Sequence, residues 1–172
     1  MADAERVEKL NAMKRANIEP YPYSFNQTHH AAEIISNFVK LEGKKVSVAG
    51  RLMTIREHGK LTFCDLRDGS GNIQLWLAED ELGKDYDLLK YLEAGDFVGV
   101  EGKVAKTKRG EPSVKASKLV VLTKSLRHLP SQWYGLKDAE IRYRQRYVDL
   151  IMNPKVKEIF ITRTKIVDAI RA

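Results

Sequence analysis

The stretches 61-LTFCDL-66 and 72-NIQLWL-77, with the turn 68-DGSG-71 between them, decide the fold of this sequence. In both stretches apolar residues recur at every second position, a period typical of strands that bury one face. Aspartate followed by glycine, serine and glycine is typical of a hairpin turn. The sequence therefore predicts two neighbouring antiparallel strands joined by this turn.

Three further segments continue the two-residue period around this hairpin. They are 45-KVSVAG-50, 96-DFVGVEGKV-104 and 113-SVKASKLVVL-122. Segment 79-EDELGKDYDLLKYL-92, between the third and fourth predicted strands, has the spacing of a helix. Three strands, a helix and two strands form the order of an OB-fold, a barrel that binds oligonucleotides on its second and third strands. The fold class we expect is mainly β: a five-stranded OB-fold Greek-key barrel with N-terminal helices and C-terminal connector helices.

Helical signals precede the predicted barrel. Val7 and Leu10 fall near helical spacing and predict a helix over Ala4–Asn17. Thr28 is expected to cap a second helix that runs through Lys40. We therefore expect an N-terminal helical extension over residues 1–43.

Helical signals also follow the barrel. Asp138 is expected to cap a helix that continues to Ile151, and Asn153-Pro154 to begin a last helix. The last helix reaches the end of the sequence in the middle of its pattern, so we expect a piece of a longer chain. The expected organisation is a barrel over 44–123, a connector over 124–153 and the start of a further domain over 154–172.

The composition excludes several classes of protein. The 172 residues, 43% of them hydrophobic, contain no apolar run near the roughly 20 residues that span a bilayer, and the start lacks a signal-peptide pattern. We therefore expect a cytoplasmic protein with no membrane partner. The single cysteine, Cys64, is expected to be a small packed residue. The histidines lack companions at metal-ligand spacing and no catalytic motif stands out, so we expect neither metal ligands nor catalytic residues.

Positive charge is concentrated in two places. The net charge is +7, and residues 124–172 contain 11 basic and 5 acidic side chains. Within the barrel region, basic residues gather around Glu111: Lys103, Lys106, Lys108, Arg109, Lys115 and Lys118. Such patches favour a polyanionic partner. The alternative is a solvated edge whose lysines prevent pairing with other strands.

Alternation along the two central strands assigns side chains to faces. If Cys64, Leu66 and the apolar residues of 73–77 point inward, then Phe63, Gln74 and Trp76 point outward together. An exposed ring beside an amide suits an unpaired base, which stacks on the ring while its edge accepts and donates hydrogen bonds. Trp76 is expected to be either a second stacking platform or a cover for the barrel edge.

The segment 135-GLKDAEIRYRQRYVDL-150 resembles a GLxDxExRYRxRYxDL pattern of class II lysyl-tRNA synthetases, in which it links the anticodon-binding domain to the catalytic domain. The resemblance extends over nearly the whole chain. It implies that the chain is the N-terminal part of such an enzyme and that its partner is the anticodon stem-loop of tRNA(Lys). It implies a homodimeric parent that is a lysine–tRNA ligase using ATP and Mg²⁺. The segment itself would be non-catalytic and hold no cofactor.

The resemblance also implies roles for individual residues. Phe63 would stack on the central anticodon base, a uridine, and Gln74 and Arg56 would contact the same base. Glu111 would contact a neighbouring anticodon base. Phosphates would be held by the connector arginines and by the basic loop, in particular by Lys106, Lys108 and Arg109.

Three other interpretations remain open. A nonspecific single-strand-binding OB module explains the barrel and the basic loop. An aspartyl- or asparaginyl-tRNA synthetase domain would share the Phe63 and Gln74 positions. A fragment that serves protein contacts would use the N-terminal or the last helix.

Overall fold

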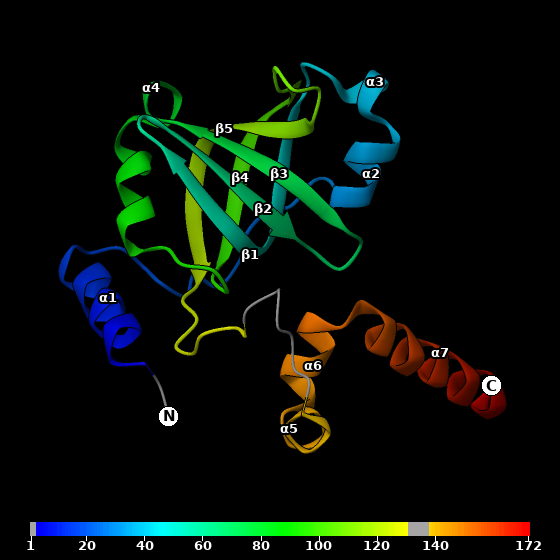
Figure 1. Cartoon of the computed structure of the whole chain (residues 1–172). Coiled ribbons are helices and arrows are strands. Elements are labelled where there is room, and N and C mark those ends of the chain that lie inside the picture. The colour runs from blue at the N-terminus through cyan, green and yellow to red at the C-terminus, as the bar shows by residue number, and fades with distance from the viewer. Residues whose placement is uncertain (1–2, 131–137) are drawn as a thin grey trace. The chain divides into compact units, whose positions relative to one another are not determined.

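The computed structural model describes residues 3–130 and 138–172 (Figure 1). The chain divides into two compact units, Met1–His128 and Leu129–Ala172. The first three residues of the predicted connector motif, 135–137, lie outside the described residues.

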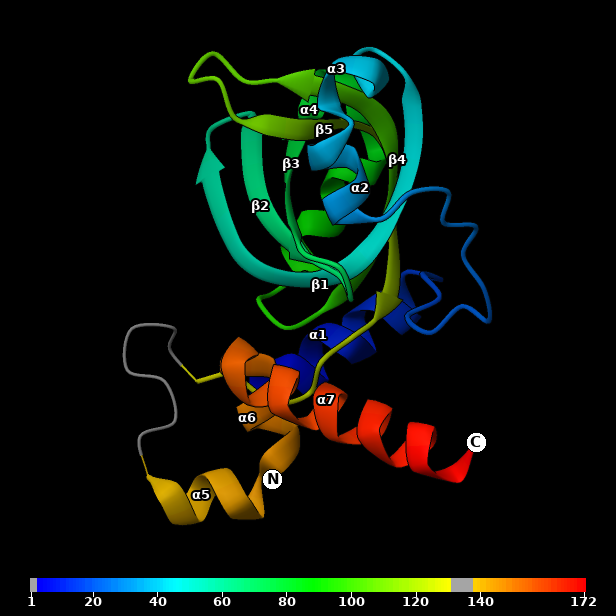
Figure 2. The same ribbon diagram turned by 90° about the vertical axis from the view of Figure 1, so that its right-hand side faces the viewer.

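The first unit is built around a closed barrel of five strands (Figures 1 and 2). The strands are β1 (Lys45–His58), β2 (Leu61–Arg67), β3 (Asn72–Ala78), β4 (Phe97–Lys106) and β5 (Pro112–Thr123). Their order is β1-β2-β3-β5-β4, and β4 pairs with β1 to close the barrel. All neighbours are antiparallel except β3 and β5, which are parallel. The predicted OB-fold barrel is confirmed, with a first strand longer than its alternating segment.

The faces predicted for the central strands are also confirmed. Cys64 and Leu66 are fully buried, and the apolar residues of β3 that alternate with Gln74 and Trp76 are at most 3% exposed. Burying apolar surface stabilises the fold by roughly 25 cal/mol per Å², so this interior supplies the main driving force. Phe63 and Trp76 lie on the opposite face and are half-buried.

Two strands approach each other closely at Gly102 in β4. A Cβ atom there would lie 2.2 Å from the carbonyl oxygen of Lys115 in β5. The register between the two strands shifts between Glu101 and Gly102, which is the pattern of a β-bulge. Only glycine fits, because the paired backbone has no room to move away from a side chain.

The N-terminal extension differs in part from its prediction. Helix α1 (Ala4–Arg15) forms as expected. The second helix was predicted wrongly, because it begins later and is divided into α2 (Ala31–Ser36) and α3 (Phe38–Leu41). Thr28 does not cap it. Instead, the Thr28 N–H donates to the Ser47 carbonyl of β1, and the Thr28 hydroxyl accepts from the Ser47 N–H at 2.9 Å.

The predicted hairpin turn holds helix α2 on the barrel. Asp68 accepts a hydrogen bond from the Ala31 N–H at 2.8 Å and others from Ser70 and Gly71. Burial alone would raise the pKa of Asp68, but these hydrogen bonds outweigh it, led by the one from Ala31, and the pKa lies below its ordinary value. The turn therefore joins β2 to β3 and also caps α2.

The helix expected between the third and fourth strands is two short elements. They are α4 (Glu79–Leu82) and the 3₁₀ helix η1 (Gly83–Tyr91), on the side of the barrel opposite α2 (Figures 1 and 2). Gly83 has a φ of +55°, which an L-residue rarely adopts, so the α-helix ends there.

The described residues of the second unit, 129–130 and 138–172, form three helices. They are α5 (Ala139–Arg144), α6 (Arg146–Met152) and α7 (Pro154–Arg171). Asp138 caps α5 as predicted, accepting from the N–H groups of Glu140 and Ile141. The predicted single helix to Ile151 is interrupted at Gln145, and α7 begins at Pro154 as expected.

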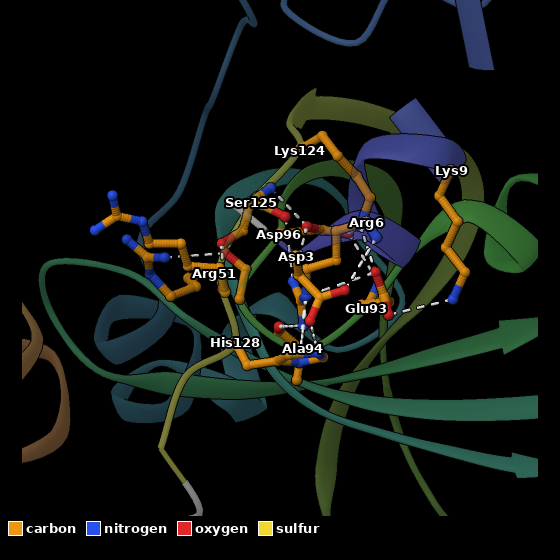
Figure 3. A network of polar contacts seen from close by, with 12 residues as sticks. Asp3, Arg6, Lys9, Arg51, Glu93, Ala94, Asp96, Lys124, Ser125 and His128 are labelled. Carbon is orange, nitrogen blue, oxygen red and sulfur yellow. Dashed lines mark hydrogen bonds and ion pairs between the residues drawn. The ribbon is translucent and has the colours of Figure 1, made fainter. Parts of the chain in front are cut away.

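A buried ionic network joins α1 to the segment that leaves β5 (Figure 3). Lys124 lies 2.8 Å from Asp96 and 2.9 Å from Glu93, and both Lys124 and Asp96 side chains are fully buried. Arg6 of α1 is 2% exposed and donates to the Ala94 and Ser125 carbonyls. One face of the N-terminal helix is therefore packed against the rest of the first unit.

The ionisation of Glu93 makes the stability contributed by this network depend on pH. Burial alone would raise the pKa of Glu93, but Lys124 and Lys9 outweigh it and the pKa lies below its ordinary value. Folding therefore favours the ionised carboxyl. Its contribution to stability is complete above the ordinary pKa of glutamate and is lost as pH falls through the lower folded-state value.

Replacement of Lys124 tests this network. Lys124→Met should lower the free energy of unfolding by about 3–5 kcal/mol, because it removes the closest cation from the buried Asp96 carboxylate and leaves, among the described residues, only Arg6, at 3.9 Å. Chemical denaturation followed by circular dichroism measures the change. Lys118→Met is the matched control: Lys118 pairs with Glu101 on the surface, so the loss should stay below about 1 kcal/mol. Equal losses for both variants would contradict a special role for the buried pair.

Cys64 provides a second test of the barrel interior. Burial raises the pKa of the Cys64 thiol to about 12, and the thiolate is the reactive form. Reaction with a disulfide reagent at pH 8 should therefore be on the order of a thousandfold slower in the folded protein than in denaturant. Immediate reaction of the folded protein would show that the barrel interior is accessible to the reagent.

Candidate nucleic-acid interface

Four side chains lie in register across four strands on the outer face of the barrel. Arg56 of β1 is paired with Phe63 of β2, Phe63 with Trp76 of β3, and Trp76 with Lys115 of β5. The Phe63 and Trp76 ring centroids are 6.3 Å apart, with ring planes inclined by 36°. The row reads cation, ring, ring, cation across the sheet.

A second, polar row runs beside the first. Its members are Thr54, Asp65, Gln74 and Ser113, again paired strand by strand across β1, β2, β3 and β5. The Ser113 hydroxyl donates to Gln74 Oε1 at 2.8 Å, and Gln74 Nε2 donates to Glu111 Oε2 at 2.8 Å. Thr54 donates to the Asp65 carboxylate. Each polar group that could face a ligand is thus already held by a neighbour.

Gln74 lies on the predicted face but is not exposed as predicted. It is only 8% exposed, and Glu111 and Ser113 bind the two ends of its amide. The predicted exposure of Gln74 followed from alternation alone. Alternation shows which face of the strand a residue lies on, but not that the loop before β5 covers that residue. Gln74 is still outside the barrel core, because its neighbours Ile73 and Leu75 point inward.

Arg56 lies near the end of β1, shortly before β2 begins at Leu61. Its guanidinium donates two hydrogen bonds to Asp65, at 2.9 and 3.1 Å. This bidentate contact raises the pKa of Arg56. The side chain remains 45% exposed, so it is both oriented and accessible.

Trp76 has features of both roles proposed for it. Its ring is half-buried beside Phe63, and Lys115 Nζ lies 5.3 Å from the ring centroid. Lys115 is in turn held by Glu81 at 2.7 Å. The indole N–H is buried and has no hydrogen-bond partner among the described residues. The exposed part of the ring extends the aromatic surface of Phe63.

The basic loop lies between β4 and β5, next to this face. Lys106, Lys108 and Arg109 are exposed there, as is Glu111. The loop is a tight turn in which Gly110 has a φ of +88° and Thr107 and Glu111 exchange hydrogen bonds. The Glu111–Gln74 contact attaches this loop to the outer face.

The structure thus brings Arg56, Phe63, Gln74, Trp76 and Glu111 together on one face. The sequence prediction did not include Asp65 and Ser113 among the site residues, and it named Lys115 only as a member of the basic patch. Alternation along β2 also places Asp65 on the face of Phe63, and its contact with Arg56 follows once the register of β1 and β2 is known. Ser113 and Lys115 join the site only through the pairing of β5 with β3, which no local pattern indicates.

Within residues 3–130 and 138–172, no group of three His, Cys, Asp or Glu side chains is arranged to hold a metal ion. No helix among the same residues is long and apolar enough to cross a membrane.

Comparison with known protein families agrees with this geometry. The tRNA anti-codon family, described as an OB-fold nucleic acid binding domain, matches residues 46–122, which is nearly the whole barrel. The fold and the outward face therefore define a nucleic-acid-binding OB module.

Comparison with curated proteins is more specific. The chain is 52% identical to a lysine–tRNA ligase of Moorella thermoacetica, over 98% of this chain and 35% of that protein. It is 51% identical to the enzyme of Carboxydothermus hydrogenoformans, over 96% and 34%, and 43% identical to that of a Dehalococcoides mccartyi strain, over 99% and 36%. The chain belongs to the lysyl-tRNA synthetase family and spans about a third of the length of these relatives.

Proposed function

We propose that the outer face of β1, β2 and β3 binds the anticodon loop of tRNA(Lys). The observation that carries this proposal is the row of Arg56, Phe63 and Trp76, half-exposed and in register, beside the amide of Gln74. The family match of the barrel and the names of the relatives support the same choice. The mechanism is binding, with no bond made or broken in this part of the chain.

Stacking on Phe63 would supply base-dependent affinity. A base stacked on an aromatic ring contributes about 1–3 kcal/mol and needs no particular sequence. Phe63 is flanked by Arg56 and Trp76 in its own row, so a base on its ring would have a cation on one side and a second ring on the other. We expect the central anticodon base, a uridine, to occupy this position.

Hydrogen bonds would supply base identity. The free edges of Gln74 and Arg56 would bind the Watson–Crick edge of that uridine, and Glu111 would contact a neighbouring base. Both Gln74 and Arg56 are held by partners before any RNA arrives. Fixing these groups in advance lowers the ordering cost of binding.

The basic loop would supply charge. Lys106, Lys108 and Arg109 are exposed beside the face, where they can neutralise phosphates. Phosphate contacts raise affinity without distinguishing sequences.

For the whole protein we propose the activity that the relatives' names state, attachment of lysine to tRNA. ATP and Mg²⁺ are the cofactors expected for that reaction, and a homodimer in the cytoplasm is the expected form. The residues described here would contribute recognition of the tRNA.

Replacement of Phe63 tests the stacking role. Phe63→Ala should weaken binding of an anticodon stem-loop with a central uridine by roughly 5- to 150-fold, the loss of one stacked base. Binding of an unrelated RNA hairpin should change less than about twofold, because charge supplies that affinity. Fluorescence anisotropy with labelled RNA measures both.

Tyr23→Ala is the matched control, because Tyr23 is a fully exposed ring elsewhere in the same unit. It should leave both affinities unchanged. Equal losses for the two RNAs in Phe63→Ala would favour nonspecific single-strand binding. Unchanged binding after replacement of both Phe63 and Gln74 would favour a protein-contact role.

Salt dependence tests the basic loop. Joint replacement of Lys106, Lys108 and Arg109 by glutamine should reduce the slope of log affinity against log salt by about 0.7 for each lost phosphate contact. The control replaces three exposed lysines outside the loop, Lys14, Lys44 and Lys84, with the same change in net charge. Equal slopes for the two triple variants would show that the loop does not contact phosphates.

A further inference from the structure

The Gln74 amide lies between two partners of different chemical kinds. Its nitrogen donates to the Glu111 carboxylate, and its oxygen accepts from the Ser113 hydroxyl, both at 2.8 Å. The amide has two N–H donors and two oxygen lone pairs. These two contacts engage one of each, so one donor and one acceptor position are left for a ligand.

The two partners do not constrain the amide equally. An ionised carboxylate can only accept, whereas a hydroxyl can donate or accept. If the amide turned over, Ser113 could accept from its nitrogen and donate instead to the Glu111 carbonyl, which lies 3.2 Å from the hydroxyl. Glu111 would then face the amide oxygen with two acceptors in contact. Glu111 therefore decides the orientation, and Ser113 tolerates both.

The orientation of a glutamine amide decides which pyrimidine it matches. Uridine presents an N–H donor beside a carbonyl acceptor, while cytidine presents a ring acceptor beside an amino donor. The same amide edge binds one base in one orientation and the other base after a half-turn. An oriented amide can therefore distinguish two bases of nearly identical shape, which stacking on Phe63 cannot.

We infer that Glu111 is a positioning residue that sets pyrimidine selectivity by fixing the orientation of the Gln74 amide. This inference rests on the proposed binding of the anticodon loop and specifies how its central base is selected. It assigns Glu111 an action through Gln74 that is distinct from direct contact with a neighbouring base.

Glu111→Gln tests the inference with a nearly isosteric change. The new amide can present either its nitrogen or its oxygen to Gln74, so both orientations of Gln74 are satisfied. In the wild type, an anticodon stem-loop with central uridine should bind roughly 10- to 100-fold more tightly than the same RNA with central cytidine. In Glu111→Gln this ratio should fall to within about threefold of one. Glu111 is exposed, so the variant should fold, and circular dichroism verifies this.

Ser113→Ala is the matched variant within the same network. It removes the Ser113 hydroxyl but leaves the Glu111 carboxylate. The ratio of the affinity for the uridine stem-loop to that for the cytidine stem-loop should therefore stay within about twofold of the wild-type value. Ser117→Ala, on the same strand with its hydroxyl on the Glu101 carbonyl, controls for loss of a serine. A ratio lost in Ser113→Ala and kept in Glu111→Gln would overturn the inference.

A double-mutant cycle separates action through Gln74 from direct base contact. In a Gln74→Met background the amide is absent, so Glu111→Gln should no longer change the ratio. A change of the same size in both backgrounds would mean that Glu111 contacts RNA independently. If the wild type binds no stem-loop in a Phe63-dependent way, the proposed function itself fails. If it does and Glu111→Gln keeps the full ratio, only the orientation mechanism fails.

Discussion

The parallel pairing of β3 with β5 is the contact on which the rest of the structure depends. Its register sets Gln74 opposite Ser113 and Trp76 opposite Lys115. The same pairing closes the barrel, because β5 then continues to β4 and β4 to β1. Residues almost forty positions apart in the chain thereby meet on one face. This register completes the closed interior and adds the β5 members to both outer rows, which the β1–β2 and β2–β3 pairings begin.

The elements around the barrel are attached by polar groups in buried or half-buried positions. Asp68 caps α2, and Thr28 binds the β1 backbone. The network around Lys124 and Asp96 holds α1 against the segment that leaves β5. Such contacts cost desolvation, and their geometry is specific, so they fix where each extension sits more than they add net stability. The face that we propose for RNA carries none of these attachments and stays accessible.

The barrel could be predicted from sequence because its information is local. The two-residue period identified the strands, put Cys64 inside and put Phe63 outside. Local signals were less reliable where tertiary contacts compete with them: Thr28 is a good cap by type, but Ser47 of β1 binds it. Gly83 ended a helix that periodicity alone extended. The candidate site was found through its face and through family resemblance. The burial of Gln74 was missed because its cover comes from a loop distant in sequence.

The carboxylates on this face explain how such a surface would favour recognition of a particular base over general affinity for RNA. A surface built only to attract a polyanion would exclude negative charge. Here Asp65 binds Arg56, Glu111 binds Gln74 and Glu81 binds Lys115. Each carboxylate weakens the attraction for phosphate, and each restricts the orientation of a group that would face a base. A free guanidinium or amide can adapt to several base edges, whereas a fixed one fits few. Under the proposed function, the basic loop beside the face restores the charge that these three contacts remove.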